Sequence, residues 1–508
     1  MGQPNHLSYT PSDTEKAEFQ VAEYAESDSE REARLQQQNE CKENAKLESK
    51  IRMKADLYLV PIVSLIFLFS FIDRANIGNA RIAGLEKDLG MKGTDFNISL
   101  SIFYISYILF EIPCNTLCKW IGPGWFLPIL TLCFGILTMC TGFVQSFSSL
   151  CAVRFLLGIF EAGIMPGLVL YLSRWYRQSE LTFRISLFIV SGSLAGAFGG
   201  LLASAILSIS RMGSLHTWRL IFAIEGMATC VLGIICFFLL PDGPRAAKWY
   251  TDEEKEYAVR RIKEERSSSD EEVVDKFNWT KLRRGIFNPV VFTTSIIFLL
   301  NSVTVQGASF FLPTLVSTIF PDQGVRTKQL LTVPPYILGA IACVAASYAS
   351  WRMNRRGVFI IGCAFPSVVG YALFIATHNP KIRYGAMFLP FLGIYTYGAL
   401  TNAHVAANVV SETAKASAIG FNVMFGSVGG LASTWAFVSS DAPYYDIGTG
   451  LNLAAQASMV LVGSGLYWWI VRDNKRRERL DSTELLRGKP ASEVQNMDWK
   501  HPDFRWNN

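Results

Sequence analysis

The sequence predicts an all-α integral membrane protein, with twelve transmembrane helices arranged as two six-helix bundles. Two observations support this fold class. The 508 residues are 50% hydrophobic and 18% charged, below the roughly 25% of charged residues in soluble domains. Charged residues gather in the two tails and one central segment, and long apolar runs alternate with short polar breaks between them. About 20 apolar residues are enough to cross a bilayer as a helix.

The apolar runs define the expected helices. Six are expected in the first bundle, over residues 57–77, 96–117, 126–145, 150–173, 183–208 and 218–240. Six more are expected over residues 288–312, 329–350, 358–377, 384–407, 417–438 and 452–471. The resulting divisions are a disordered cytoplasmic tail (1–54), a bundle (55–240), a cytoplasmic linker (241–286), a second bundle (287–472) and a cytoplasmic tail (473–508). Two six-helix halves around a charged linker are typical of transporters built from repeats.

Basic residues near the helix ends predict that both termini are cytoplasmic, because Lys and Arg favour cytoplasmic loops. These residues are Arg52, Lys54, Arg174, Arg177, Arg184, Arg352, Arg355, Arg356, Arg472, Lys475, Arg476 and Arg477. The opposing loops also contain basic residues, such as Lys87 and Arg326, so the prediction depends mainly on the two ends and the linker. Neither tail shows a retention signal such as KDEL, and the plasma membrane is therefore expected.

The run LCAVRFLLGIFEAGIMPGLVLYLSRW contains two ionisable residues, Arg154 and Glu161, within an apolar spanning segment. A spacing of two helical turns puts them on one face, about 10 Å apart along the axis. Such groups cost about 2.5–3.5 kcal/mol or more at the centre of a bilayer, and they usually face a bundle interior or a water-filled path. The alternative is that Arg154 extends to the interface and Glu161 pairs locally.

The first spanning helix contains a second group of charges, Asp73 and Arg74, in SFIDRANIGNA. Adjacent helical residues point about 100° apart, so these two need not pair with each other. One can face the helix of Arg154 while the other faces a cavity. An interfacial pair that ends the helix is the alternative interpretation.

Two further acidic residues, Glu111 and Glu225, lie in apolar segments, and both are expected to have structural roles. In the second bundle, polar residues suggest a substrate lining rather than a charged centre. These candidates are Asn301, Gln306, Asn402, His404 and Asn408. Any single Asn can instead be a helix–helix hydrogen bond, and a lone His in a helix is more often structural.

Small residues predict close helix contacts, because glycines every fourth residue let backbones approach. These positions are Gly192, Gly196 and Gly200 in SGSLAGAFGG, and Gly426 and Gly430 in GFNVMFGSVGG. They are expected to form the surfaces along which the halves slide. In the linker, Thr251 followed by Glu254 predicts the start of a surface helix over about 251–266.

The sequence contains no enzyme signature. It has no GxxxxGK[ST] phosphate loop, no HExxH and no CxxC pair. No catalytic residue, metal site or cofactor is therefore expected. The net charge of +5 is too small and scattered to indicate nucleic-acid binding. The expected partners are the lipid bilayer, a small organic anion and protons, and the protein is expected to be a monomer.

Several runs resemble the anion:cation symporter family of the major facilitator superfamily, and in particular its fungal allantoate/nicotinate/pantothenate permease branch. They are DRANIGNA (73–80), EIPCN (111–115), RFLLGIFEAGIMPGLVLYLSRWY (154–176), IFAIEG followed by LPDGP, YTDEEK (250–255) and GASFFLP (307–313). The resemblance covers residues 55–472. The chain departs from that branch at Gln306, where a Tyr is common, and it lacks a Trp ahead of the Asn residues near 402.

The resemblance implies proton-coupled import of a small organic carboxylate by alternating access. In that case Arg74 and Arg154 would hold the carboxylate, and Asp73 and Glu161 would accept the protons. Arginine binds a carboxylate with paired hydrogen bonds. Burial favours a neutral carboxyl group, whereas a neighbouring arginine favours the ionised one.

Two other functions remain open from the sequence. An exporter of an acidic metabolite by proton antiport would use the same charges, and only the direction of transport separates it from an importer. A nutrient sensor would bind without transporting, and it would usually need a longer signalling tail than the residues after Arg472.

Overall fold

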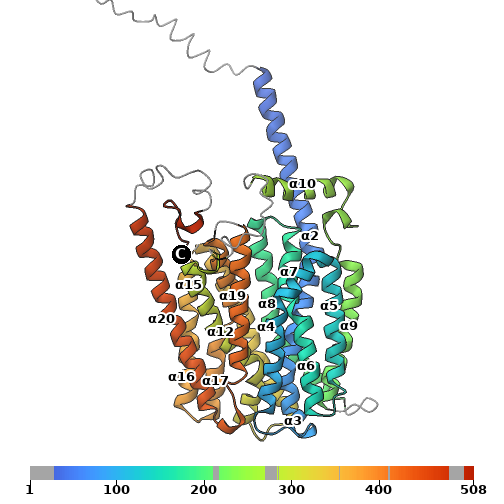
Figure 1. Ribbon diagram of the computed structural model, residues 1–508, viewed down its shortest axis with the longest axis vertical. Coiled ribbons are helices and arrows are strands. Elements are labelled where there is room, and N and C mark those ends of the chain that lie inside the picture. Colours follow the sequence, from blue (N-terminus) through green and yellow to red (C-terminus); the bar gives the residue numbers. More distant parts are fainter. Residues whose placement is uncertain are drawn as a thin grey trace, which may run out of the picture.

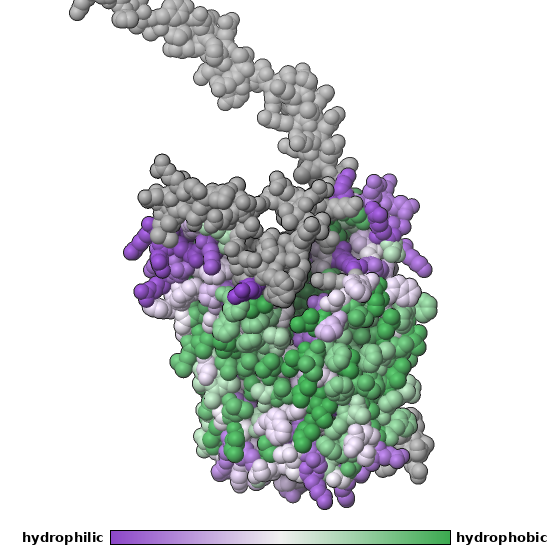
Figure 2. Space-filling view, viewed as in Figure 1, coloured by the Kyte–Doolittle hydropathy of each residue, from purple (hydrophilic) through white to green (hydrophobic). Residues whose placement is uncertain are grey.

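The structure is a computed structural model that describes residues 28–209, 217–268, 283, 285–353, 355–409, 412–479 and 497–507. The secondary structure of these residues is helical, without a β-strand. The long helices run side by side in two groups, one from each half of the chain (Figure 1). The apolar belt around their middle separates two polar ends (Figure 2).

The N-terminal half packs its helices in pairs: α2 against α8, α4 against α6, and α5 against α9. Its helices are α2 (Asp28–Ile82), α3 (Leu85–Asp88), α4 (Asp95–Ile121), α5 (Pro123–Thr141), α6 (Phe147–Ala162), α7 (Ile164–Ser173), α8 (Gln178–Ile206) and α9 (Trp218–Leu239).

The C-terminal half packs α12 against α19, and α16 against α17 and α20. Its helices are α12 (Pro289–Ile319), α13 (Val325–Leu330), α14 (Val333–Met353), α15 (Arg356–Gly362), α16 (Ala364–Ala376), α17 (Pro380–Phe391), α18 (Tyr397–Ala407), α19 (Glu412–Ser433) and α20 (Asp446–Arg477).

Each of the twelve predicted spanning segments coincides with one of these helices or with a consecutive pair. Ten segments of the described chain are long and apolar enough to cross a membrane. The segment at 384–407 is divided into α17 and α18. Asn301 Nδ2 donates to the Ile394 carbonyl in this break at 3.0 Å, which satisfies an acceptor that the interrupted helix leaves free.

The first helix begins earlier than predicted. The tail before the spanning segment is expected from its sequence to be disordered or loosely helical, and α2 is helical from Asp28 and continues without a break into the spanning segment. Residues 1–27 lie outside the described residues. The run from Asp28 contains mostly good helix formers and no Pro or Gly before Pro61, so the spanning helix can propagate into it.

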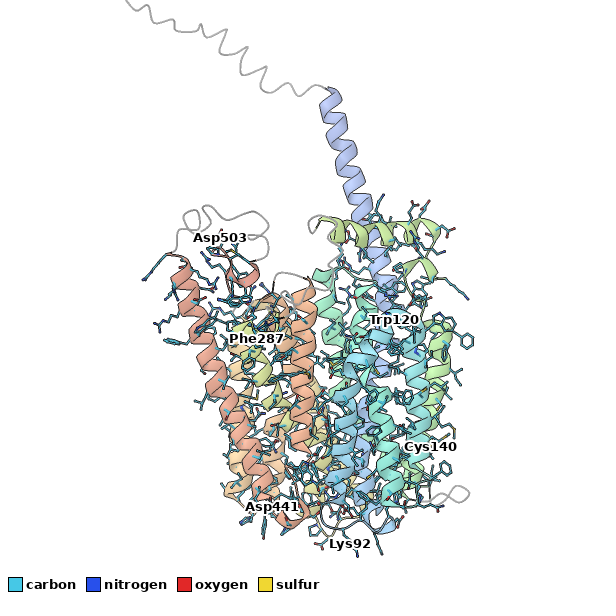
Figure 3. All side chains as sticks on the ribbon, viewed as in Figure 1. Lys92, Trp120, Cys140, Phe287, Asp441 and Asp503 are labelled. Carbon is cyan, nitrogen blue, oxygen red and sulfur yellow. The ribbon has the colours of Figure 1, made fainter. Side chains whose placement is uncertain are left out.

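The central linker contains the predicted surface helix, α10 (Asp252–Ser268), which lies across the end of the N-terminal half (Figure 1). Its start is the predicted capping box. The Glu254 amide donates to Thr251 Oγ1 at 3.3 Å, and the Thr251 amide donates to Glu254 Oε2 at 3.1 Å. We call this end of the molecule the linker side. The opposite end carries α3 and η2 (Ser439–Asp441), with Lys92 and Asp441, and we call it the loop side (Figure 3).

The two halves are joined by hydrogen bonds on the loop side. Asn97 Nδ2 donates to the Thr434 carbonyl at 2.5 Å, and the hydroxyls of Ser101 and Thr434 lie 2.8 Å apart. Arg81 Nη2 donates to Ser439 Oγ at 3.0 Å. We call these contacts the loop-side interface.

The five predicted packing glycines divide between two kinds of contact. Gly196 lies against Tyr336, Gly200 against Thr332 and Gly430 against Tyr104, and each of these contacts joins the two halves. Gly192 instead faces Phe67 and Phe71, and Gly426 faces Phe298, so these two pack within their own half.

Candidate functional site

Asp73 and Arg74, adjacent on α2, point to different partners in the middle of the N-terminal half. Arg74 Nε donates to Glu161 Oε1 at 2.8 Å. The two side chains are 10% and 1% exposed, so this is a buried ion pair. Breaking such a pair by removing one partner costs about 3–5 kcal/mol in a protein interior.

Asp73 has two partners from other helices. Thr138 Oγ1 on α5 donates to Asp73 Oδ1 at 2.9 Å. Arg154 Nη1 on α6 lies 4.0 Å from Asp73 Oδ2, and Arg154 Nε and Nη2 have no hydrogen-bond partner. This pair is therefore looser than Arg74–Glu161, and Arg154 retains donors that a further acceptor could use.

Aromatic rings surround the Arg74 guanidinium. Its central carbon lies 5.1 Å from the ring centroid of Phe71, 5.4 Å from Phe103 and 4.9 Å from Tyr107. Rings at this distance attract a cation through their quadrupole. They also exclude water, which strengthens the electrostatic interaction of Arg74 with any carboxylate.

Close approach of α4 and α6 brings Glu161 to this centre. A Cβ on Gly158 would meet Ser106 Oγ and the Phe103 carbonyl, so only glycine permits the observed spacing. Gly158 precedes Glu161 by nearly one turn of α6 and sets its height relative to Tyr107 and Arg74.

Two more carboxyl groups are buried in the same half. Glu111 is 8% exposed, and its Oε2 has no hydrogen-bond partner. Glu225 is 2% exposed and accepts a hydrogen bond from Asn76 Nδ2. The centre therefore contains four carboxyl groups, on Asp73, Glu111, Glu161 and Glu225, and two guanidinium groups, on Arg74 and Arg154.

Gln306 lies on α12, one turn before the contact that this helix makes with α2 across the two halves. Gly78 on α2 meets the Phe310 carbonyl on α12, and both helices run from the linker side to the loop side (Figure 1). One turn back from that contact lie Arg74 on α2 and Gln306 on α12. Gln306 is half-buried, and its Oε1 has no partner.

The other predicted polar residues of the C-terminal half differ in how many of their side-chain atoms are hydrogen-bonded. Asn301 Nδ2 donates to the Ile394 carbonyl, and Asn301 Oδ1 has no hydrogen-bond partner. Asn402 accepts from Asn422 Nδ2 at 3.0 Å and donates to the Gly398 carbonyl at 2.8 Å. Gly398 faces Ile189 of the other half, and Asn402, one turn along, shares that face.

His404 and Asn408 are not brought to the centre. His404 is 1% exposed and lines a small apolar cavity with Ile297 and Gly463, inside its own half. Asn408 accepts from the Asn507 amide at 2.8 Å and donates to the His404 carbonyl at 2.9 Å. Its side chain is occupied by the C-terminal segment at the end of α18, so the geometry does not support the predicted substrate contact.

Sequence reasoning missed several groups of this site. Phe71, Phe103 and Tyr107 are three of many aromatic residues, and nothing in their spacing distinguishes them. The sequence gives only a weak reason to single out Thr138, which is one of few residues with a hydroxyl group in the apolar run 126–145. Glu111 and Glu225 were noticed, but they were expected to have structural roles.

The sequence of this chain is similar to those of known transporters. Residues 63–434 match the Major Facilitator Superfamily. The chain belongs to this superfamily. It is 33% identical over 470 residues to the MFS-type transporter cnsO of Penicillium expansum, covering 90% of each chain. It is 30% identical over 463 residues to the high-affinity nicotinic acid transporter of Saccharomyces cerevisiae, covering 91% of this chain and 85% of the relative.

Solved structures share the fold of this superfamily member. A bacterial homologue of the human lysosomal transporter Spinster superposes with a TM-score of 0.61 at 14% identity, over 81% of this chain and 96% of that one. The nucleoside transporter NupG superposes with a TM-score of 0.54 at 13% identity, over 80% and 99%. The protein is thus an integral, multi-pass membrane transporter with the all-α major facilitator fold.

Proposed function

We propose that this transporter belongs to the anion:cation symporter family and imports a small organic carboxylate, such as nicotinate, together with protons. The main support is the buried Arg74–Glu161 pair, because the Glu161 carboxylate lies where a substrate carboxylate would bind Arg74. The aromatic rings around Arg74 suit a small, planar acid. The nicotinic acid transporter among the relatives is consistent with this substrate class.

The proposed cycle begins when protons bind at Glu161 and Asp73. A neutral Glu161 releases the Arg74 guanidinium, which then binds the substrate carboxylate with paired hydrogen bonds. The substrate replaces one carboxylate by another, so the net charge of the closed centre stays low. After the halves rearrange, Glu161 loses its proton and competes for Arg74, which favours release of the anion on the cytoplasmic side.

The test is uptake of labelled nicotinate into cells that express the protein, at acidic and near-neutral external pH, with and without a protonophore. We expect saturable uptake that is stronger at acidic pH and lost with the protonophore. Net efflux driven by an imposed gradient would instead establish an exporter. Absence of movement in either direction, for nicotinate and for a panel of other small carboxylates, would contradict the proposal.

Glu161→Gln tests the role of the carboxyl group. The amide mimics the protonated state and cannot release a proton, so we expect proton-driven accumulation to be lost while exchange of labelled for unlabelled substrate continues. Glu253→Gln is the control, because Glu253 is exposed on α10. Full accumulation by Glu161→Gln would remove Glu161 from the coupling mechanism.

A further inference from the structure

Glu225 is a buried carboxyl group with no cation beside it among the described residues. It lies on α9 and is 2% exposed. Its Oε2 accepts a hydrogen bond from Asn76 Nδ2, and its Oε1 has no hydrogen-bond partner. An ionised carboxylate in such a place is strongly unfavourable unless it is paired. The proton-coupling mechanism above does not use this residue.

The charged groups around Glu225 come from two neighbouring helices. From α2, Asp73 exerts a negative field on Glu225. From α6, the Arg154 guanidinium lies 5.7 Å from the ring of Phe222, nearly one turn from Glu225 on α9, but its ion-pair partner is Asp73. The side facing α5 presents the neutral Thr138 and Met139, and α8 presents Gly199 against Asn76.

The charge balance of the centre also favours a neutral Glu225. Arg74 pairs with Glu161, and Arg154 pairs with Asp73. An ionised Glu225 would therefore add a negative charge next to Asp73 without a cation to balance it. A neutral Glu225 removes this repulsion.

Two asparagines connect Glu225 to the loop side. Asn79 Nδ2 donates to Asn76 Oδ1 at 2.9 Å, and the Asn76 amide in turn donates to Glu225. Both amide dipoles point their donors toward the carboxyl group, and hydrogen bonds in series strengthen one another. These two hydrogen bonds in series can stabilise the Glu225 carboxylate while its proton is on Asp73.

We propose that Glu225 is a further proton-binding residue of the transport cycle, which holds a proton in this conformation and exchanges it with Asp73. In the exchange, the O–H bond on Glu225 breaks and an O–H bond forms on Asp73. Asp73 then becomes neutral and releases Arg154, while Asn76 holds the Glu225 carboxylate. The proposal rests on the proposed proton-coupled transport, but its first test does not need a substrate.

The first test is infrared spectroscopy of the purified protein in lipid vesicles, in which a protonated carboxyl group absorbs separately from a carboxylate. At near-neutral pH we expect Glu225→Gln to lack one protonated-carboxyl absorption that the unchanged protein shows. Glu253→Gln, at an exposed site on α10, should lose only a carboxylate absorption. Loss of a carboxylate absorption in Glu225→Gln would overturn the proposal, whether or not nicotinate is the substrate.

The exchange with Asp73 is tested in the same spectra and in transport. Asp73→Asn should change the pH at which Glu225 ionises, and an unchanged titration would overturn the link between the two groups. With labelled nicotinate, Glu225→Gln removes the residue that supplies the proton to Asp73, so we expect proton-driven accumulation to fall and its pH dependence to change. If Glu225→Gln accumulates substrate to the same level and with the same pH dependence as the unchanged protein, Glu225 is only a structural hydrogen-bond acceptor.

Discussion

Gly78 determines how closely α2 and α12 approach each other. A Cβ at this position would meet the Phe310 carbonyl oxygen, which belongs to the backbone and cannot move aside as a side chain could. We expect Gly78→Ala to separate the halves at the loop-side interface and to cost about 1–3 kcal/mol of stability in the closed conformation. The measurement is thermal unfolding of the purified protein, together with the exposure of a cysteine placed at Asn97.

The matched control for that substitution is Gly465→Ala on α20, where an added Cβ meets no neighbour within 4 Å. Alanine there should be neutral or slightly stabilising, because it has the higher helix propensity. Equal effects of the two substitutions would show that the backbone contact at Gly78 has no special role.

Ion pairs hold the helix α10 to the N-terminal half: Arg261 pairs with Glu180 and Glu48, and Glu254 pairs with two lysines of α2. Glu254 Oε2 accepts from Lys54 Nζ at 2.7 Å, and its Oε1 lies 3.1 Å from Lys50 Nζ. Burial raises the pKa of this carboxyl group, but the hydrogen bonds from Lys54, the Thr251 amide and Lys50 outweigh it and hold the pKa below its ordinary value. The ionised Glu254 therefore stabilises the docked linker.

The pH dependence follows from that lowered pKa. The stabilisation by ionised Glu254 is fully present above the pKa of the unfolded state, about 4.3. It is lost as the pH falls through the lower pKa of the folded state. We expect Glu254→Gln to destabilise the protein by about 1–2 kcal/mol at neutral pH. The difference from the unchanged protein should shrink in acid, and thermal unfolding at both pH values measures it. Glu253→Gln should behave like the unchanged protein, and a constant difference at all pH values would contradict the assigned ion pairs.

The alternating-access transport that we propose requires the loop-side interface to open. The Ser101 and Thr434 hydroxyls lie 2.8 Å apart across it, so cysteines at both positions can form a disulfide after small adjustments. We expect Ser101→Cys/Thr434→Cys to lose transport under oxidising conditions and to regain it with a reductant. Each single substitution is the control, and unimpaired transport by the cross-linked protein would mean that this interface does not open.

The fold could be predicted from the sequence because membrane spans depend on length and hydropathy, which a single chain displays directly. The burial of Asp73, Arg74, Arg154 and Glu161 inside the bundle was predictable because charges in apolar segments are costly in contact with lipid. Their pairing was not predictable, since α2, α5 and α6 meet only in three dimensions. The same reason explains why Thr138 was missed and why Asn408, which binds the C-terminal segment, was placed at the site.

The charged centre lies wholly in the N-terminal half, whereas Asn301, Gln306, Asn402 and Asn422 provide neutral amides from the other half. Amides and hydroxyls can be exchanged for one another at modest energetic cost, but a buried charge can be removed only together with its partner. Under the proposed mechanism, substitutions in the C-terminal half can therefore change the substrate while the N-terminal half keeps the proton-coupling residues. Variants with a new substrate preference and unchanged coupling are therefore expected to carry their substitutions in the C-terminal half.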